Sequence, residues 1–539
     1  MVRRGFFSFV VASLAGIGAL AAVGRPAAAL WALAGVGPIV AVGLHDVLQT
    51  KRSLLRNYPV IGHGRYLFEA IRPEIQQYFV ESDTDGAPFD REHRAIVYQR
   101  AKGALQTVPF GTKRDVYAVG HEWLVHSLAP RPPREAEPRV RIGGPRCRVP
   151  YLASRLNVSA MSYGSLSKQA ILALNLGART GGFWHNTGEG GLSPYHLEHG
   201  GDLVWQIGTG YFGCRTPDGR FDANVFAERS HIESVRMIEI KLSQGAKPAH
   251  GGILPAAKVS PEIAAIRGVP VGQDVLSPPY HSAFSTPAGL LEFVERLRQL
   301  SGGKPVGFKL CVGDRVQFLA ICKAMLATGI TPDFITVDGA EGGTGAAPME
   351  FANSVGMPLV DGLSFVHNAL VGAGLRDDIR LVASGKIVTG FHIARAIALG
   401  ADVCNSARGM MMALGCIQAR RCNDNTCPVG IATSDPRLSK AIDVDKKAER
   451  VARFHADTIE ALLELVGAAG LESPDEIGPE HVMRRVAHHE VRSFAELYEQ
   501  LEPGCLRDGA APGAWRAAWD RARPDRFAAA PRRGALVAA

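Results

Sequence analysis

Short apolar runs that end in glycine and polar residues recur from about residue 150 to residue 436. Most are followed by a stretch with apolar residues at helical spacing, such as Arg315 to Thr328 and Phe391 to Leu399. Strands that alternate with helices over this length predict a parallel sheet closed as a (β/α)8 TIM barrel. The expected strands are Leu156 to Gly164, Gly182 to Gly191, Leu203 to Gly213, Val235 to Gln244, Pro305 to Val312, Asp333 to Gly339, Ile379 to Lys386 and Ala401 to Arg408.

An open, doubly wound sheet is the alternative reading of the same alternation. The best candidate for a dinucleotide fingerprint is Gly342-Gly-Thr-Gly-Ala-Ala. Its glycines do not have the G-x-G-x-x-G spacing that such a sheet uses to bind a dinucleotide. The barrel is therefore the favoured fold.

Two stretches near the N-terminus, residues 6–24 and 27–44, contain no charged residue. Each is long enough to cross a bilayer as a helix. Arg3 and Arg4 precede the first and Lys51 follows the second, so the positive-inside rule predicts a hairpin with both ends in the cytoplasm. We expect membrane attachment through residues 6–44, in the inner (cytoplasmic) membrane, with the catalytic domain facing the cytoplasm. A cleaved twin-arginine signal and a pair of buried soluble helices are the alternatives.

The pattern divides the chain into five parts. Residues 1–50 form the two-helix membrane anchor, 51–149 a helical and irregular linker region that packs on the barrel, and 150–436 the barrel. Residues 437–520 are a helical extension, in which helices are expected at Lys446 to Val466 and within Glu480 to Leu501, and 521–539 are a disordered tail. The proline-rich run from Pro130 to Pro138 marks the boundary before the barrel.

The composition narrows the setting. The formal net charge of +8 comes from scattered arginines rather than from a basic run interleaved with aromatic residues, so no nucleic-acid partner is expected. Nine cysteines without a disulfide-like pattern fit a reducing compartment with a metal site better than a secreted scaffold.

Cys416, Cys422 and Cys427 follow one another at intervals of six and five residues, and Pro428 follows the last. Structural zinc sites use closely paired cysteines and a fourth ligand, whereas iron–sulfur clusters accept wider spacings and often end in a Cys-Pro step. The run therefore favours an iron–sulfur cluster. Three unrelated buried or surface thiols are the alternative.

In a barrel of this kind, the loops after the seventh and eighth strands commonly hold a phosphate. Here the seventh strand leads into Ser384 and Gly385, and the eighth into Arg408 and Gly409. Small residues let backbone N–H groups approach an anion, and the arginine adds a charged partner. The alternative is that these residues only form tight turns and bind no ligand. This alternative is less favoured because both loops follow the strands after which a barrel commonly holds a phosphate.

Several motifs together resemble the FMN-binding synthase domain of glutamate synthases. They are Ile240-Lys241-Leu-Ser-Gln-Gly-Ala-Lys247-Pro, Asp338-Gly-Ala-Glu-Gly-Gly-Thr-Gly-Ala346, Ser159-Ala-Met-Ser-Tyr-Gly164, Asn186-Thr-Gly-Glu-Gly-Gly191 and the cysteine run. The resemblance covers roughly residues 150 to 436. It implies a (β/α)8 barrel that carries FMN and a [3Fe-4S] cluster held by Cys416, Cys422 and Cys427.

The resemblance also implies cofactor contacts. Ala160, Met161 and Ser162 would lie against the flavin, with Lys309 near its pyrimidine edge, where an ammonium stabilises the reduced ring. Gly343, Thr344 and Gly345 would shape the pocket after the sixth strand, and Ser384, Gly385, Arg408 and Gly409 would bind the FMN phosphate.

For catalysis, the resemblance implies reduction of the imine of 2-oxoglutarate or a related keto acid to an amino acid, as an oxidoreductase acting on CH–NH2 donors in L-glutamate biosynthesis. Lys241, Lys247 and Arg267 would meet the two substrate carboxylates. Electrons would come from a ferredoxin or a separate reductase, and pass through the cluster to FMN.

Two departures bear on the substrate. Where the family has Pro-Gly-Glu-Gly-Gly-Gln after the second lysine, this chain has Pro248-Ala-His250-Gly-Gly-Ile253. A lost amide donor beside a carboxylate costs about 1–3 kcal/mol if the oxygen is buried. A different amino or hydroxy acid substrate, or an electron-transfer subunit without its own amination activity, are therefore alternatives. Because Met1 leads straight into apolar residues, no amidotransferase domain is expected, and nitrogen would come from ammonia, an amine or a partner.

Overall fold

The structure, a computed structural model, describes residues 2–528. Its internal contacts divide the chain into two compact units, one that ends at Arg91 and one that begins at Glu92. Each unit is described by itself.

The first unit is helical. Helix α1 (Val2–Ala22) and helix α2 (Pro26–Leu48) are joined by a short turn at Gly24, whose φ is +73°, and they contact one another. Both are long and apolar enough to cross a membrane, by length and composition alone. The expected helices are thus present, and their insertion into a membrane stays a prediction. Helix α3 (Ser53–Asn57), helix α4 (His63–Ile75) and a π-helical turn η1 (Gln76–Val80) follow.

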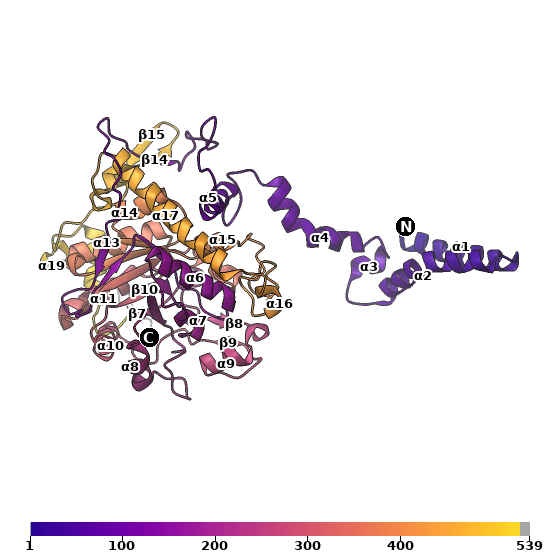
Figure 1. Ribbon diagram of the computed structural model, residues 1–539, viewed down its shortest axis with the longest axis horizontal. Coiled ribbons are helices and arrows are strands. Elements are labelled where there is room, and N and C mark those ends of the chain that lie inside the picture. The colour runs from indigo at the N-terminus through magenta and orange to yellow at the C-terminus, as the bar shows by residue number, and fades with distance from the viewer. Residues whose placement is uncertain (1, 529–539) are drawn as a thin grey trace, which may run out of the picture. The chain divides into compact units, whose positions relative to one another are not determined.

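In the described part of the second unit, eight parallel strands close a barrel (Figure 1). The strands are β4 (Leu156–Val158), β5 (His185–Asn186), β6 (Leu203–Ile207), β7 (Val235–Lys241), β10 (Val306–Leu310), β11 (Phe334–Asp338), β12 (Arg380–Ser384) and β13 (Val403–Ser406). Each lies inside one of the eight expected runs. The last strand, β13, pairs with the first, β4, so the TIM barrel prediction is confirmed.

Helices surround the barrel, and their ends follow from local sequence. Ser167 caps α6 (Lys168–Gly181) by accepting from the N–H of Ala170, and Gly182 ends it with a φ of +65°, which glycine adopts without steric cost. The others that flank the strands are α7 (Pro194–Leu197), α8 (Ala223–Ser230), α9 (Pro261–Arg267), α10 (Pro287–Leu300), α11 (Arg315–Thr328), α12 (Met349–Ser354), α13 (Leu359–Ala373), α14 (Gly390–Ala398) and α15 (Arg408–Leu414), with short turns η2 (Ala256–Lys258) and η3 (Arg376–Asp378).

A β-hairpin closes the N-terminal end of the barrel. Strands β2 (Val140–Ile142) and β3 (Tyr151–Ala153) pair antiparallel, and their apolar side chains join one buried cluster with residues from the beginnings of the barrel strands. Those residues are Trp184, Val204, Met237, Phe334, Val382 and Val403. The opposite, C-terminal end is free to carry polar groups.

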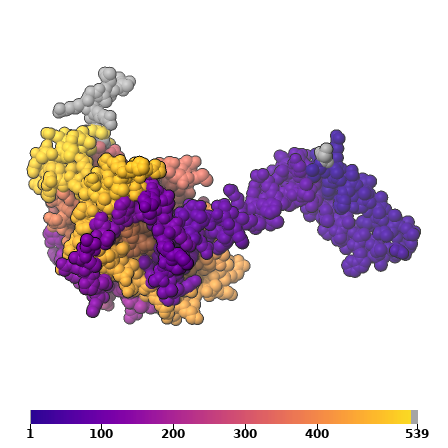
Figure 2. Space-filling view, turned by 90° about the horizontal axis from the view of Figure 1, so that it is seen from above, coloured from indigo at the N-terminus to yellow at the C-terminus, as the bar shows by residue number. Residues whose placement is uncertain are grey.

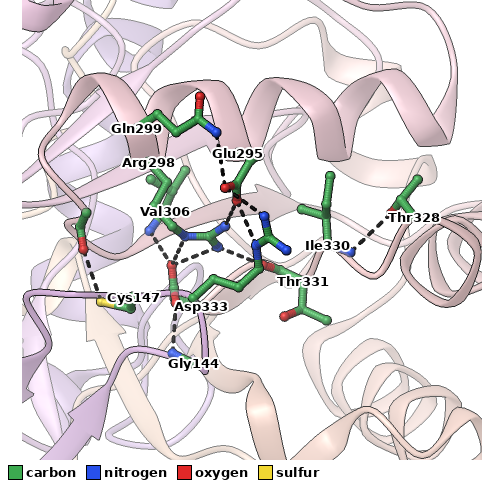
Figure 3. Close-up of polar contacts among 12 residues, drawn as sticks. Gly144, Cys147, Glu295, Arg298, Gln299, Val306, Thr328, Ile330, Thr331 and Asp333 are labelled. Atoms are coloured by element: carbon green, nitrogen blue, oxygen red, sulfur yellow. Dashed lines mark hydrogen bonds and ion pairs between the residues drawn. The ribbon is translucent and has the colours of Figure 1, made fainter.

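The same N-terminal end holds a buried ion-pair network (Figure 3). The carboxylate of Asp333 accepts from the Arg298 guanidinium and from the backbone N–H groups of Gly144 and Val306, at 2.8 to 3.2 Å. Arg298 also pairs with Glu295, which binds Arg146 from the hairpin loop. The network therefore ties the hairpin, α10 and the start of β11 together.

The C-terminal extension packs on the outside of the barrel unit. Helix α17 (Val444–Ala468) lies along α6, and Arg100 on α5 (Arg91–Lys102) donates to Thr458 of α17. The orange and yellow extension and the purple segment after Glu92 lie together on this surface (Figure 2). The remaining elements are α16 (Pro436–Ser439), η4 (Pro474–Glu476), η5 (Pro479–His481), α18 (Phe494–Leu497), α19 (Cys505–Asp508) and α20 (Gly513–Arg521).

The expected helical extension is confirmed by α17 and α20, but one part of it differs. The region from Glu480 to Leu501, within which one or two helices are expected, forms the hairpin of β14 (Val482–Ala487) and β15 (Glu490–Ser493), followed by the short helix α18. Strand β14 also pairs with β1 (Glu122–Leu124), and Arg484 donates to the Glu122 carboxylate. The pairing with a strand distant in sequence therefore overrides local helical preference.

Candidate functional site

The polar residues of the proposed site lie at the C-terminal ends of the barrel strands. Lys241 ends β7 and is paired in register with Lys309 on β10, while Asp338 ends β11 opposite Ser384 of β12. The Ser384 hydroxyl in turn lies 3.5 Å from that of Ser159, after β4. Because the strands are parallel, residues far apart in sequence meet at one mouth.

The charges of three cations act on a single carboxylate at this mouth. The Lys241 ammonium lies 2.9 Å from the carboxylate of Glu189, and the charges of Lys247 and Arg267 also act on that group. Burial raises the pKa of Glu189, but the three cations outweigh burial and hold the pKa below its usual value. The structure thus brings together Lys241, Lys247 and Arg267, with more positive than negative charge.

Two of these cations have unused hydrogen-bonding capacity. Lys247 is 1% exposed, and among the described residues its Nζ has no hydrogen-bond partner. The buried Nε of Arg267 likewise has none within the described chain. Burial lowers the pKa of Lys247 to about 8 and that of Arg267 to about 10, against the opposing charge of Glu189. Buried donors without acceptors are costly, so this arrangement suits an anion with several oxygens.

Arg267, at the end of α9, is held next to the loop after β4. Its Nη2 donates to the Ser162 hydroxyl at 3.3 Å and to the Tyr163 carbonyl at 3.1 Å, and its guanidinium lies 5.2 Å from the centre of the Phe212 ring. A Cβ at Gly190 would lie 2.8 Å from the same guanidinium, so glycine is required for this approach. Arg267 therefore adjoins the loop that contains Ala160, Met161 and Ser162.

Lys309 is buried near the end of β10, at the barrel mouth. Its ammonium lies 3.2 Å from the Asp338 carboxylate, which also accepts from the Gly245 N–H at 2.8 Å. Burial lowers the pKa of Lys309, but the charges of Asp338 and Glu239 outweigh burial and raise it. Lys309 is thus kept as a cation inside the barrel.

Glu239, inside the barrel, supplies part of the negative charge that raises the pKa of Lys309. It is 1% exposed, and its carboxylate accepts from Asn186, Gln206 and Thr336 at 2.6 to 2.8 Å. All three donors are neutral, so the hydrogen bonds satisfy the oxygens without cancelling the charge.

The two predicted phosphate loops converge with the glycine-rich loop after β11. Arg408 Nη2 donates to the Glu341 carbonyl at 2.7 Å, and a Cβ at Gly343 would lie 2.9 Å from the Arg408 guanidinium. A Cβ at Gly409 would lie 2.4 Å from the Ser406 hydroxyl, and one at Gly385 would press on Leu359 at 3.1 Å. Glycine at these positions therefore lets the loops pack closely against Arg408, Ser406 and Leu359, and their contact with a phosphate stays a prediction.

The cysteine run lies beside the glycine-rich loop after β11. Cys422 and Cys427 act electrostatically on Cys416, whose carbonyl accepts from the Tyr98 hydroxyl at 2.7 Å. A Cβ at Gly345 would lie 3.3 Å from the Cys422 carbonyl oxygen, and Thr344 is exposed between Gly343 and Gly345. Among the described residues, no three His, Cys, Asp or Glu side chains gather closely enough to hold a metal ion. Three thiols on one loop are nonetheless the donor type that iron–sulfur clusters use, and the cluster stays a prediction.

The two departures lie on the loop that follows Lys247. The Nδ1 of His250 lies 3.0 Å from the carbonyl of Gly251, and the ring stands edge-on to Phe351. Ile253 begins β8 (Ile253–Leu254) and is paired with Leu276 of β9 (Val275–Leu276). A Cβ at Gly252, between them, would lie 2.5 Å from the Glu189 carboxylate, so this loop borders the cation cluster.

Sequence reasoning did not assign roles to Glu189, Glu239 or Lys258, which the structure places among the expected site residues. Glu189 lies in the quoted Asn186-Thr-Gly-Glu-Gly-Gly motif just after an expected strand. The rule that barrel strand ends meet could have indicated it. Glu239 and Lys258 carry no comparable sequence signal, because their neighbours come from distant segments.

Comparison with known proteins gives the family. The family model described as the conserved region in glutamate synthase matches residues 135–472 of this chain. The glutamate synthase large subunit-like protein YerD of Bacillus subtilis (strain 168) is 39% identical over 499 residues, which cover 85% of this chain and 94% of that protein. The chain therefore belongs to the glutamate synthase family, and the prediction of a glutamate synthase-like oxidoreductase is confirmed at that level.

A second relative is the archaeal-type glutamate synthase [NADPH] of Thermotoga neapolitana (strain ATCC 49049 / DSM 4359 / NBRC 107923 / NS-E), which is 35% identical over 342 residues. The match covers 62% of each chain, so this chain spans less than two thirds of that protein. Among solved structures, a mandelate oxidase variant covers 80% of this chain with 15% identity and a TM-score of 0.42, and a flavocytochrome b2 variant covers 83% with 11% identity and a TM-score of 0.43.

Proposed function

We propose that this chain is an FMN- and iron–sulfur-dependent oxidoreductase that interconverts a dicarboxylic keto acid imine, such as that of 2-oxoglutarate, and the corresponding amino acid. The observation that carries the proposal is the excess of cations at the barrel mouth. Lys241, Lys247 and Arg267 face one carboxylate, Glu189, and two of them keep buried donors without a partner within the described residues. A substrate with two carboxylates would supply the missing acceptors.

The residues present fit FMN. At positions 343, 385 and 409 a Cβ would press on Arg408, Leu359 and Ser406, so glycine keeps these loops closely packed, and Arg408 would be the charged partner of a phosphate. Ser162 and Lys309 would border the flavin ring. When bound, FMN would supply a two-electron carrier able to reduce an imine carbon. Lys309, held as a cation by Asp338, would offset negative charge on the reduced ring.

The chain's own residues would orient the substrate. Arg267 reaches from the anion cluster to Ser162, so a carboxylate bound there would be fixed relative to the loop that lines the flavin. Positioning of this kind, rather than acid–base chemistry alone, can supply much of the acceleration of a two-electron transfer between bound partners.

The test uses the purified, anaerobic full-length protein. Reduced flavin should be reoxidised by 2-oxoglutarate with ammonia, and oxidised flavin should be bleached by L-glutamate. An Arg267→Met variant should bind FMN yet lose most of both responses. A protein that binds no flavin, or flavin that responds equally with and without the dicarboxylic compounds, would contradict the proposal.

A different amino or hydroxy acid as substrate is the second candidate, and Ile253 favours it. This apolar side chain replaces the family's glutamine on the loop beside Glu189. Bleaching by a panel of amino and hydroxy acids distinguishes the two. An electron-transfer role without amination would be indicated by a flavin that exchanges electrons with dyes but with none of these compounds.

The electron donor and the location are part of the same proposal. We expect a ferredoxin or a separate reductase as donor, and attachment to the cytoplasmic membrane through α1 and α2 with the barrel in the cytoplasm. Sedimentation of the full chain, but not of a variant lacking residues 2–48, with membranes after alkaline washing would support the attachment.

A further inference from the structure

Lys258 is a buried lysine that the proposed substrate and FMN contacts do not use. It ends the turn η2 between β8 and α9 and is 3% exposed. Its ammonium donates to the Ser165 carbonyl at 3.1 Å and to the Ala432 carbonyl at 2.9 Å. An ammonium has three N–H groups, so one donor remains after these two bonds.

After burial, the groups that act most on the pKa of this ammonium belong to the cysteine run and not to the substrate cluster. The thiols of Cys422 and Cys427 act on it most strongly among its charge partners, followed by the exposed Asp424. The charge of Lys258 in turn acts to lower the pKa of Cys422, although burial outweighs it and raises that pKa. Lys258 therefore faces the cysteine run from inside the protein.

The cysteine loop is fastened to the segment that carries Lys258. Asn425, between Cys422 and Cys427, donates to the Ala257 carbonyl at 3.1 Å. Its own side-chain oxygen accepts from Thr433 and from the N–H of Ser434, at 2.9 and 2.7 Å. The position of the lysine relative to the thiols is thus set by several hydrogen bonds and not by a flexible side chain alone.

We propose that Lys258 is a positioning residue for the iron–sulfur cluster: its buried charge and its remaining N–H act on the cluster sulfurs and raise the cluster's reduction potential. This inference rests on the proposed function, because it requires the cluster at Cys416, Cys422 and Cys427. Net charge, hydrogen bonds to sulfur and burial are the factors that set such potentials. Reduction adds one electron and hence one negative charge, which a fixed neighbouring cation stabilises.

The bonds of Lys258 also connect the cluster to the rest of the site. Ser165 lies three residues after Ser162, in the loop expected against the flavin, and Arg267 is among the charges that act on Lys258. A cation in this place would favour electron delivery to the cluster from a weak reductant.

The test is a one-electron redox titration of the cluster in Lys258→Gln, followed by electron paramagnetic resonance, with iron content measured in parallel. Glutamine keeps an N–H for the carbonyls but removes the charge. We expect the equilibrium constant for reduction to fall at least tenfold, a shift of about 59 mV toward lower potential. Lys258→Arg, which keeps the charge, should stay near the wild-type value.

Lys304→Met is the matched control. The Lys304 ammonium also donates to backbone carbonyls, those of Ser230, Ile232 and Val235, but at the N-terminal end of the barrel. This variant should leave the cluster potential unchanged even if stability falls.

The outcomes separate the two proposals. A wild-type protein that binds flavin but no iron would contradict the proposed cluster itself. A loaded Lys258→Gln with an unchanged potential, or an equal shift in Lys304→Met, overturns the role of Lys258. If Lys258→Gln loses its iron, Lys258→Arg decides: retained iron with the wild-type potential supports the role of the charge, and loss of iron there too overturns it.

Discussion

The two ends of the barrel differ in how fully their buried charged groups are hydrogen-bonded. At the N-terminal end, Asp333 accepts from Arg298 and from two backbone N–H groups, and Glu295 binds both Arg298 and Arg146. At the C-terminal end, three cations share Glu189, and the described residues leave donors of Lys247 and Arg267 without partners.

The difference separates stability from function. A fully satisfied buried network holds segments in register, and breaking it exposes every partner to a desolvation cost. A buried donor without an acceptor destabilises the free protein, and a ligand that supplies the acceptor removes this cost. The same kinds of residue therefore indicate structure at one end and binding at the other, according to their bonding and not their identity.

The largest expected effect comes from breaking the N-terminal network. Asp333→Ala would leave the Arg298 guanidinium and the N–H groups of Gly144 and Val306 without their acceptor. We expect the free energy of unfolding to fall by about 3–5 kcal/mol, measured by chemical denaturation. Flavin content and substrate affinity of the remaining folded protein should be unchanged. The double change Asp333→Leu with Arg298→Met should lose less, and an equal or greater loss would contradict this account.

Removing a cation at the C-terminal end should not lower the free energy of unfolding, in contrast to Asp333→Ala. Lys247→Met deletes a buried ammonium whose Nζ has no partner in the described chain, so unfolding free energy should hold or rise by about 1 kcal/mol. Binding of 2-oxoglutarate, followed by flavin absorbance or calorimetry, should weaken roughly 10- to 100-fold, because charged hydrogen bonds are lost. A loss of stability similar to that of Asp333→Ala would show that the two ends do not differ.

The pH dependence of binding sharpens the same contrast. Burial lowers the pKa of Lys247 to about 8 in the free protein, so its charge is present below that pH and is lost as the pH rises through it. A bound dianion favours the charged form, and the dissociation constant of 2-oxoglutarate should rise about tenfold between pH 7 and pH 9. Lys247→Met should lack this step. A wild-type dissociation constant that is flat over this range would remove Lys247 from the binding site.

The sequence predicted the barrel well because its signals are local and repeated. The run from Arg315 to Thr328 is bounded by Asp314, which caps α11, and by Gly329 at a φ of +65°, and the expected and observed limits coincide. In the region after Glu480, the one cap of this kind among the described residues, Ser493 with Glu496, begins only the four-residue α18. The hairpin of this region forms because β14 pairs with Glu122–Leu124, more than 300 positions earlier, at the register Glu122 to Arg484.

The site was predictable in outline and not in its electrostatics. Strand ends meet in any parallel barrel, so Lys241, Lys309 and Ser384 could be assigned to one mouth from their positions. That Glu189 pairs with Lys241, and that Lys258 faces Cys422, depends on how loops of irregular length fold back. No periodicity encodes those distances.

The smallest expected effect concerns selectivity at the C-terminal end. Ile253 borders the loop whose Gly252 approaches the Glu189 carboxylate, and Ile253→Gln would restore an amide donor next to the cation cluster. One added hydrogen bond of this kind stabilises by about 1 kcal/mol, so affinity for 2-oxoglutarate should rise roughly fivefold. Ile253→Met, similar in size but without a donor, is the control and should bind as the wild type does. If both variants bind alike, the isoleucine does not decide between diacids and other substrates, and the leftover donors of Lys247 and Arg267 alone set the preference at this end of the barrel.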